Sequence, residues 1–219
     1  TEKIILKPFA EGVNLLSNNY SDKNFVILKL EKNRISISLF KNKSFIYTED
    51  FNFGLNLIIK DISKLCSLKI EEVDNFFQEI ELKNILENSL ESYLDKKYFS
   101  ISPYRKIKHQ LISDIISARL EELFEVCYKN NTNIKNLKSN NKIYVYIDSA
   151  KYYNNTRYIL ERANITTPEC IFYSSDEQTL LSGVIGACEL IGKGWEKEAI
   201  PITPKKKSFI SGFFSKLFS

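Results

Sequence analysis

The residues of this sequence that could bind a metal or act as nucleophiles are few and widely separated. There is one histidine, His109, and the four cysteines are Cys66, Cys127, Cys170 and Cys188. No two cysteines form a C-x-x-C pair, whereas a structural zinc site needs four closely arranged sulfur or nitrogen ligands. The sequence therefore predicts no metal centre, and it favours reduced thiols in a cytoplasmic compartment.

The excess positive charge of the sequence is confined to its last part. The net charge is +4, and residues 193–219, with six lysines and two glutamates, account for all of it. The first 192 residues hold 25 basic and 25 acidic side chains and are neutral. A nucleic-acid-binding body should present a basic face, so this distribution argues against that class of function.

Residues 208–219, the tail segment, have the pattern of an amphipathic helix. At about 100° per residue, the apolar side chains fill one half of the helical wheel and the polar residues and glycine fill the other. The apolar residues are Phe209, Ile210, Phe213, Phe214, Leu217 and Phe218, and the nearby lysines are Lys205, Lys206, Lys207 and Lys216. Aromatic rings that enter the acyl boundary and cations that meet anionic headgroups make an interfacial membrane helix. The tail segment is therefore predicted to hold an otherwise soluble protein against an anionic membrane.

Two other roles for the tail segment remain open. An amphipathic helix can insert into the groove of a partner protein, or it can pack on its own protein. Residues 193–207 contain Pro201, Pro204 and mixed charge, which favours a flexible tether and a detached helix. Twelve residues are too few for a helix that is stable alone in water, so we expect it to become ordered on contact with lipid.

The body of the chain changes from the period of strands to that of helices. Alternating or β-branched runs predict strands at 25–30, 35–40, 44–47, 143–147 and 170–173. Apolar residues at helical spacing predict helices at 56–67, 70–81, 104–129, 152–163 and 177–191, and the polar residues 130–141 predict a loop. A strand meander, a helical insertion and a return to strand–helix–strand–helix are typical of α/β proteins.

The most apolar window, residues 180–192, has the length of a helix buried in a protein core. No stretch approaches 18 uninterrupted apolar residues, so the sequence predicts no membrane-spanning helix.

Three motifs carry a resemblance to a known family. Residues 116–123, ISARLEEL, match the pattern I-x-x-R-x-x-E-[LI]. Residues 40–62 contain a strand, turn and strand (FKNKSFIYT), then Gly54, then the pair DI. Residues 181–186, LSGVIG, lie where a helix of the form A-x-A-x-G-L is expected. Together with the tethered amphipathic helix, their order and spacing resemble the second half of the FtsA family of bacterial cell-division proteins, members of the actin and heat-shock-chaperone ATPase superfamily.

The resemblance covers nearly the whole chain and implies its organisation. The implied fold is α/β, with an actin-like (RNase H-like) core subdomain, an inserted α/β subdomain and a C-terminal amphipathic helix. The core would comprise residues 1–48 and 142–192, and the insertion 49–141. The tether would occupy 193–207 and the membrane helix 208–219.

The resemblance also implies partners. The tail segment would hold the protein on the cytoplasmic face of the bacterial inner membrane, and the insertion would bind the tubulin-like division protein FtsZ. Arg119 and Glu122 would lie at or near the FtsZ contact, and the actin-like face would contact neighbouring copies in a filament. A solvated ion pair at i, i+3 on a helix face is the alternative interpretation of Arg119 and Glu122.

The sequence departs from the family where nucleotide would bind. The family's second phosphate loop reads D-x-G-G-G-T-T-D, and residues 29–36 read KLEKNRIS. The glycines that let backbone amides approach phosphate are missing, and Lys29 replaces the carboxylate that would organise the metal. The glycine-rich adenosine turn expected after residues 143–147 is replaced by DSAKYY at 148–153.

These departures imply no catalytic or nucleotide-binding residue in this chain and no cofactor. ATP and Mg²⁺ are expected only if an N-terminal half, which this chain does not contain, supplies a site. Two alternatives remain: an active actin-like ATPase whose phosphate contacts have been rebuilt, and another membrane-associated actin-like scaffold, such as one that serves pilus assembly.

Overall fold

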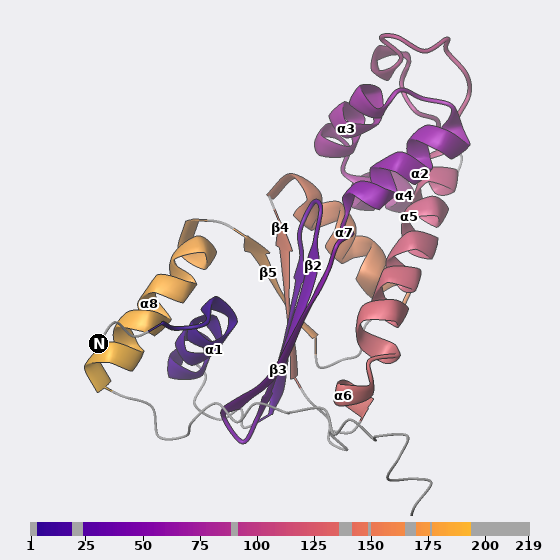
Figure 1. Ribbon diagram of the computed structural model, residues 1–219. Coiled ribbons are helices and arrows are strands. Elements are labelled where there is room, and N and C mark those ends of the chain that lie inside the picture. Colours follow the sequence, from indigo (N-terminus) through magenta and orange to yellow (C-terminus); the bar gives the residue numbers. More distant parts are fainter. Residues whose placement is uncertain are drawn as a thin grey trace, which may run out of the picture.

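The fold is built on one five-stranded sheet with the strand order β3-β2-β1-β4-β5 (Figure 1). The computed structural model describes residues 4–18, 24–88, 92–135, 142–148, 150–164, 170–175 and 177–193. The strands are β1 (Phe25–Leu30), β2 (Ile35–Lys41), β3 (Ser44–Phe51), β4 (Lys142–Asp148) and β5 (Cys170–Ser175). β1, β2 and β3 form an antiparallel meander, and β4 and β5 extend the sheet parallel to β1. The predicted meander and the return to parallel strands are confirmed, and β3 continues past its predicted end at Tyr47.

Helices cover both faces of the sheet (Figure 1). On one face lie α1 (Lys7–Asn18) and α8 (Glu177–Lys193). On the other lies α7 (Ala150–Arg162), and the group of helices between β3 and β4 packs with it and extends past one end of the sheet. These are α2 (Asn56–Cys66), α3 (Ile70–Glu79), α4 (Leu82–Asn88), α5 (His109–Phe124) and α6 (Thr132–Lys135), with a short 3₁₀ turn at Lys96–Tyr98 and a π-helical turn at Glu125–Lys129. The segment between β3 and β4 is called the insertion below.

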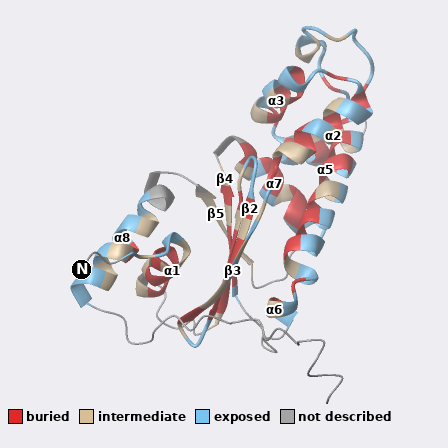
Figure 2. Cartoon of the chain, in the orientation of Figure 1, coloured by how far each residue is buried: buried red, intermediate tan, exposed pale blue. Residues whose placement is uncertain are grey.

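The alternation of side chains in β1 divides the core into two clusters. Val26 and Leu28 pack toward the helices of the insertion and α7, whereas Phe25 and Ile27 pack with Tyr144 beneath α1. Successive side chains of a strand point to opposite faces, so an apolar run such as FVILKL fits a strand buried on both faces. In Figure 2 β2 and β4 are largely buried, whereas β3, β5 and α8 are largely intermediate or exposed.

The predicted helix at 104–129 is wrong at its start and irregular at its end. α5 begins at His109, because Leu94 and Ile107 share a backbone hydrogen bond of 2.8 Å and Tyr93 forms a β-bridge with Lys108. Ile107 matched the helical spacing, but the partner strand segment lies 13 residues upstream and could not be read from that spacing. The last turn, Glu125–Lys129, is π-helical.

Three short helices were not predicted. α1 and α4 both carry apolar residues at helical spacing, Phe9, Val13 and Leu16 in the first and Leu82, Ile85 and Leu86 in the second, and Pro8 in the first turn of α1 suits a helix start. The loop predicted at 130–141 contains α6, in which Ile134 is the buried residue. The expectation of a buried helix at 180–192 is also wrong in part, because apolar residues on one face of α8 are exposed.

α1 and α8 cross at very close range. A Cβ atom on Gly186 would lie 1.8 Å from the carbonyl oxygen of Ala10, so only glycine permits this approach. Ser17 of α1 is also hydrogen-bonded to Glu189 of α8. The side of α8 that faces α1 is therefore fixed by backbone contact.

The buried carboxamide of Asn155 joins α7 to the insertion. Its oxygen accepts a hydrogen bond from the N–H of Leu82 at 3.0 Å, and its nitrogen donates to the carbonyls of Phe77 and Ile80 at 3.1 and 2.8 Å. All three groups belong to the reversal between α3 and α4. The hydroxyl of Tyr152, one turn earlier on α7, donates to Asp74 of α3.

A buried carboxylate organises the far end of the insertion. Glu72 is 1% exposed and accepts hydrogen bonds from the backbone N–H groups of Lys69, Ile101 and Ser102 at 2.9, 2.6 and 2.8 Å. Burial by itself would raise the pKa of the Glu72 carboxyl, but these bonds and one from the Ser102 hydroxyl outweigh it and lower the pKa to about 2. Glu72 thus ties the loop before α5 to the first turn of α3.

We expect Glu72→Gln to destabilise the protein in a pH-dependent way. The pKa of Glu72 is lower in the folded chain than its ordinary value of 4.5, so its stabilisation is complete above that value and is lost as the pH falls toward about 2. At pH 7 the variant should lose about 1–3 kcal/mol of unfolding free energy. Denaturant unfolding at several pH values measures this. Glu71→Gln, at the exposed neighbouring position, is the control, and a pH-independent difference would contradict the assignment.

Candidate functional surfaces

The turn between β1 and β2, at residues 31–34, is fastened to the start of α2. The N–H of Leu55 donates to the carbonyl of Glu31 at 3.0 Å, and the N–H of Asn56 donates to that of Lys32 at 2.8 Å. A Cβ on Gly54 would lie 2.2 Å from the Glu31 carbonyl oxygen, so the glycine is required for this contact. The turn is thus part of the frame that connects the sheet to the insertion.

Carboxylates surround the amide side of this turn. Asp148, at the carboxyl end of β4, accepts a hydrogen bond of 3.4 Å from the N–H of Lys32. The Lys32 ammonium lies 4.0 Å from Asp74 of α3. Glu31 pairs with Arg34 at 3.2 Å, and this hydrogen bond raises the pKa of Arg34. The turn amide that could face an anion therefore faces a carboxylate of the same chain.

Lys29 takes part in an ion pair between β1 and α1. Its ammonium is bonded to Glu11, whose side chain is only 7% exposed, and Lys7 lies 3.9 Å from the same carboxylate oxygen. Tyr146, the cross-strand neighbour of Lys29, is largely buried, and burial raises the pKa of its hydroxyl, with smaller contributions from Tyr173 and Glu11. The lysine that replaces a carboxylate in the sequence is thus balanced by a carboxylate from another element.

Arg119 and Glu122 form the predicted i, i+3 pair on α5, but Arg119 has a further partner. Its Nη1 lies 2.6 Å from Glu122, and its Nε donates to Asp61 of α2. This hydrogen bond to Asp61 raises the pKa of Arg119. The side chains of Arg119 and Glu122 are 24% and 59% exposed. Arg119 is therefore not freely exposed, because it bridges two helices of the insertion.

Two other charged residues of the helix predicted at 104–129 lie outside the regular part of α5. Lys108 precedes α5 and lies in the β-bridge with Tyr93. Glu125 belongs to the π-helical turn.

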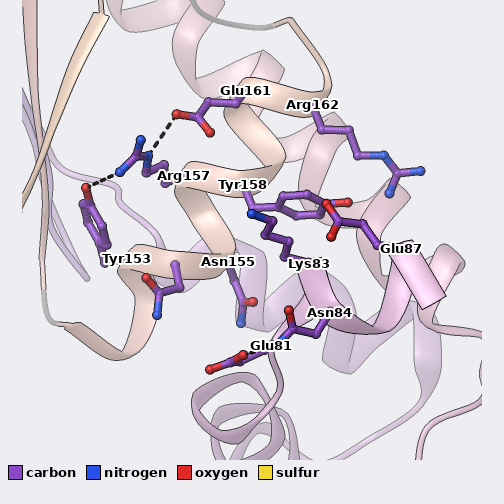
Figure 3. Close-up of a pocket in the computed structure, with 11 residues that line it drawn as sticks. Glu81, Lys83, Asn84, Glu87, Tyr153, Asn155, Arg157, Tyr158, Glu161 and Arg162 are labelled. Atoms are coloured by element: carbon purple, nitrogen blue, oxygen red, sulfur yellow. Dashed lines mark hydrogen bonds and ion pairs between the residues drawn. The ribbon is translucent and has the colours of Figure 1, made fainter. Parts of the chain in front are cut away.

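A polar groove of about 620 Å³ lies between α4 and α7 (Figure 3). Arg157 is held in its wall by Glu161 at 2.9 Å and by the Tyr153 hydroxyl at 3.2 Å. The lining residues are Glu81, Lys83, Asn84, Glu87, Tyr153, Asn154, Asn155, Arg157, Tyr158, Glu161 and Arg162. The lining holds three cations and three carboxylates, so the groove carries charges of both signs. The sequence did not reveal it because α4 was not predicted.

The thiols and carboxylates of the described residues form no group of three or more that could hold a metal. Cys66 and Cys127 are buried, and burial raises the pKa of both thiols, that of Cys127 to about 12. Cys188 is exposed. No helix within the described ranges is both long and apolar enough to cross a membrane.

The predicted membrane contacts lie outside the described residues. They comprise Lys205–Lys207 and the apolar residues and Lys216 of the tail segment. The tether, apart from Lys193, lies outside as well.

In sequence the chain is similar to the cell division protein FtsA of Neisseria meningitidis serogroup B. The identity is 22% over 126 residues, which cover 58% of this chain and 30% of that protein. The chain thus spans less than a third of the length of this relative. No protein-family model matches the chain.

In structure the chain is similar to MreB5 of Spiroplasma citri bound to ADP, with a TM-score of 0.51 and 13% identity over 85% of this chain and 59% of that one. A PilM–PilN type IV pilus biogenesis complex matches with a TM-score of 0.49 and 12% identity, over 84% of this chain and 51% of that one. At such identities the likeness shows the fold alone. The fold is that of the actin-like ATPases, as the sequence predicts.

We expect Arg119→Glu to destabilise the insertion by about 1–2 kcal/mol, because it places a carboxylate against Asp61 and Glu122. In a chain of this size this lowers the melting temperature by about 2–8 °C. Thermal unfolding measures the effect, with Lys60→Glu, an exposed charge reversal on α2, as the control. The exchange Arg119→Asp with Asp61→Arg should recover most of the loss, and an unchanged melt in the single variant would remove this bridge from the energetics.

Proposed function

We propose that this chain is an FtsA-like tether that links FtsZ filaments to the cytoplasmic face of the bacterial cell membrane. The observation that carries the proposal is the sequence similarity to FtsA, found on a chain with the actin-like fold and followed by an amphipathic segment. In this function the protein acts as a scaffold that associates with copies of itself, and the tail segment provides a peripheral membrane contact.

The tail segment supports the membrane part of the proposal. Four phenylalanines in one half of the helical wheel would each contribute about 1–3 kcal/mol when buried in the acyl boundary. The adjacent lysines would each add about 1 kcal/mol at an anionic surface.

The charges at the carboxyl edge of the sheet support a function without nucleotide. Mg²⁺ is bound by oxygen ligands, yet the position aligned with the metal-organising carboxylate is Lys29, neutralised by Glu11. A phosphate bound at the β1–β2 turn would meet Asp148 and the side chain of Glu31 instead of free glycine amides. These residues do not fit a Mg–nucleotide complex, and no step of the proposed function uses one.

FtsZ would bind the insertion, with Arg119 and Glu122 at or near the contact. The bridge to Asp61 fixes the guanidinium of Arg119 on α5, and the carboxylate of Glu122 is the more accessible of the pair. In this arrangement Arg119 stabilises the surface and orients Glu122, while the rim charges act on association rate and salt dependence.

The first test is co-flotation with anionic vesicles. The parent chain should float and carry FtsZ with it, whereas FtsZ alone should stay at the bottom of the gradient. Phe213→Glu with Phe214→Glu should lower the floated fraction of both proteins at least about tenfold, since two buried phenylalanines are lost.

The matched control for this test is Ser211→Glu with Ser215→Glu, which makes the same charge change on the polar half of the wheel. This variant should float better than the phenylalanine variant. A parent chain that never floats would disprove the membrane contact, and a parent that floats without FtsZ would favour a scaffold of another kind.

The second test is isothermal titration of the chain with Mg–ATP. Because Lys29 and the turn offer neither a metal ligand nor free amides, no saturable heat is expected at micromolar protein. A titration with ATP alone is the control. A saturable heat that requires Mg²⁺ would favour the alternative, an actin-like ATPase with a rebuilt site.

A further inference from the structure

α8 presents an apolar stripe that the described part of the chain leaves uncovered. Leu181, Val184, Ile185 and Ile191 are 53%, 59%, 45% and 74% exposed, and Cys188 is exposed among them. At about 100° per residue these five residues fall within an arc of about 120°. They are called the α8 stripe below.

The opposite side of α8 is already packed against α1. Gly183 and Gly186 face α1, and the latter touches the backbone of Ala10. The α8 stripe lies on the opposite side of the helix, so α8 has the composition of a helix that is buried all round. A contiguous apolar surface of this kind on a soluble protein marks a docking site.

The tail segment is within reach of the α8 stripe. α8 ends at Lys193, and the chain continues directly into residues 194–207 and then the tail segment. Extended at about 3.3 Å per residue, residues 194–207 span up to about 46 Å. α8 is about 25 Å long at 1.5 Å per residue. The tail segment can therefore return along the full length of the helix it follows.

The two surfaces have the same chemistry and belong to one molecule. The apolar half of the tail segment would meet the α8 stripe at an effective concentration on the order of millimolar. A short amphipathic helix that is unstable alone in water becomes ordered when its apolar face is buried on a partner helix. The same side chains would enter a membrane, so the two contacts exclude each other.

We propose that the tail segment packs its apolar half on the α8 stripe in the absence of lipid, and that an anionic membrane displaces it from this surface. The stripe and the membrane then compete for one helix. The packing on α8 stands independently of the proposed function, whereas its displacement by lipid rests on that function.

Cys188 provides a reporter in the middle of the α8 stripe. A short pulse of N-ethylmaleimide, followed by peptide mass spectrometry, gives the alkylation rate of this thiol. Cys66 and Cys127, both buried, serve as internal controls for global unfolding. The alkylation rate of Cys188 should be at least about fivefold higher in Phe213→Glu with Phe214→Glu than in the parent. In this variant the tail segment no longer covers the α8 stripe, so the fraction of molecules with an accessible Cys188 rises. Ser211→Glu with Ser215→Glu should react like the parent.

A second variant tests the stripe itself. Val184→Asn places an uncharged polar side chain at an exposed position, so the fold should be retained. Because it weakens the packing of the tail segment on the stripe, it should raise the alkylation rate of Cys188. Because the competing site is weakened, the variant should also reach half-maximal flotation at about two- to threefold less lipid. Addition of anionic vesicles to the parent should raise the Cys188 rate as well.

The outcomes separate the two proposals. Equal Cys188 rates in the parent and the phenylalanine variant would overturn packing on α8, even if the parent floats. Slow alkylation of the parent that is relieved by the phenylalanine variant, in a protein that never floats, would support packing on α8 and disprove the membrane contact. Protection of Cys188 that persists in the phenylalanine variant and increases with protein concentration would overturn the proposal in favour of a second copy of the chain.

Discussion

The placement of the insertion depends on one buried side chain, the carboxamide of Asn155. It satisfies an N–H and two carbonyls in the reversal between α3 and α4, where the backbone has left one helix and not yet closed the next. Unpaired, each buried group would cost about 1–3 kcal/mol. Because Asn155 lies on α7, which connects β4 to β5, the reversal is fixed directly to the parallel part of the sheet.

This constraint has consequences on both sides of the reversal. On one side α3 is held so that Asp74 reaches Tyr152 and the neighbourhood of Lys32. On the other side α4 is held against α7, and the polar groove forms between them (Figure 3). The insertion and the carboxyl edge of the sheet are thus parts of one polar framework. At that edge the N–H of Lys32 faces Asp148, and Lys29 is paired with Glu11.

α8 illustrates how one helix can serve two different contacts. Small residues on one side permit backbone contact with α1, and Gly186 leaves no room for a side chain there. Large apolar residues on the other side remain exposed. The first contact depends on how closely the two helix backbones can approach. The second depends on the exposed apolar area, whose removal from water is favourable. The spacing of apolar residues in the sequence shows both sides of α8 as apolar, and it therefore predicts a helix that is buried on all sides.

The sequence by itself determined the strands, many of the helices and the architecture, because FVILKL, ISISLF and IYVYI carry the period of strands and α2, α3, α7 and α8 carry that of helices. Local pattern also led to the expectation that residues 29–36 differ from the phosphate loop of the family that the chain resembles. Only the tertiary structure decided what those residues contact: Glu11 for Lys29, Asp148 for the turn, and Asp61 for Arg119. These partners lie 18, 116 and 58 residues away along the chain, and no periodicity records such pairings. The start of α5 and the exposed face of α8 were decided in the same way, since pairing and burial depend on which distant segments come to lie beside a helix.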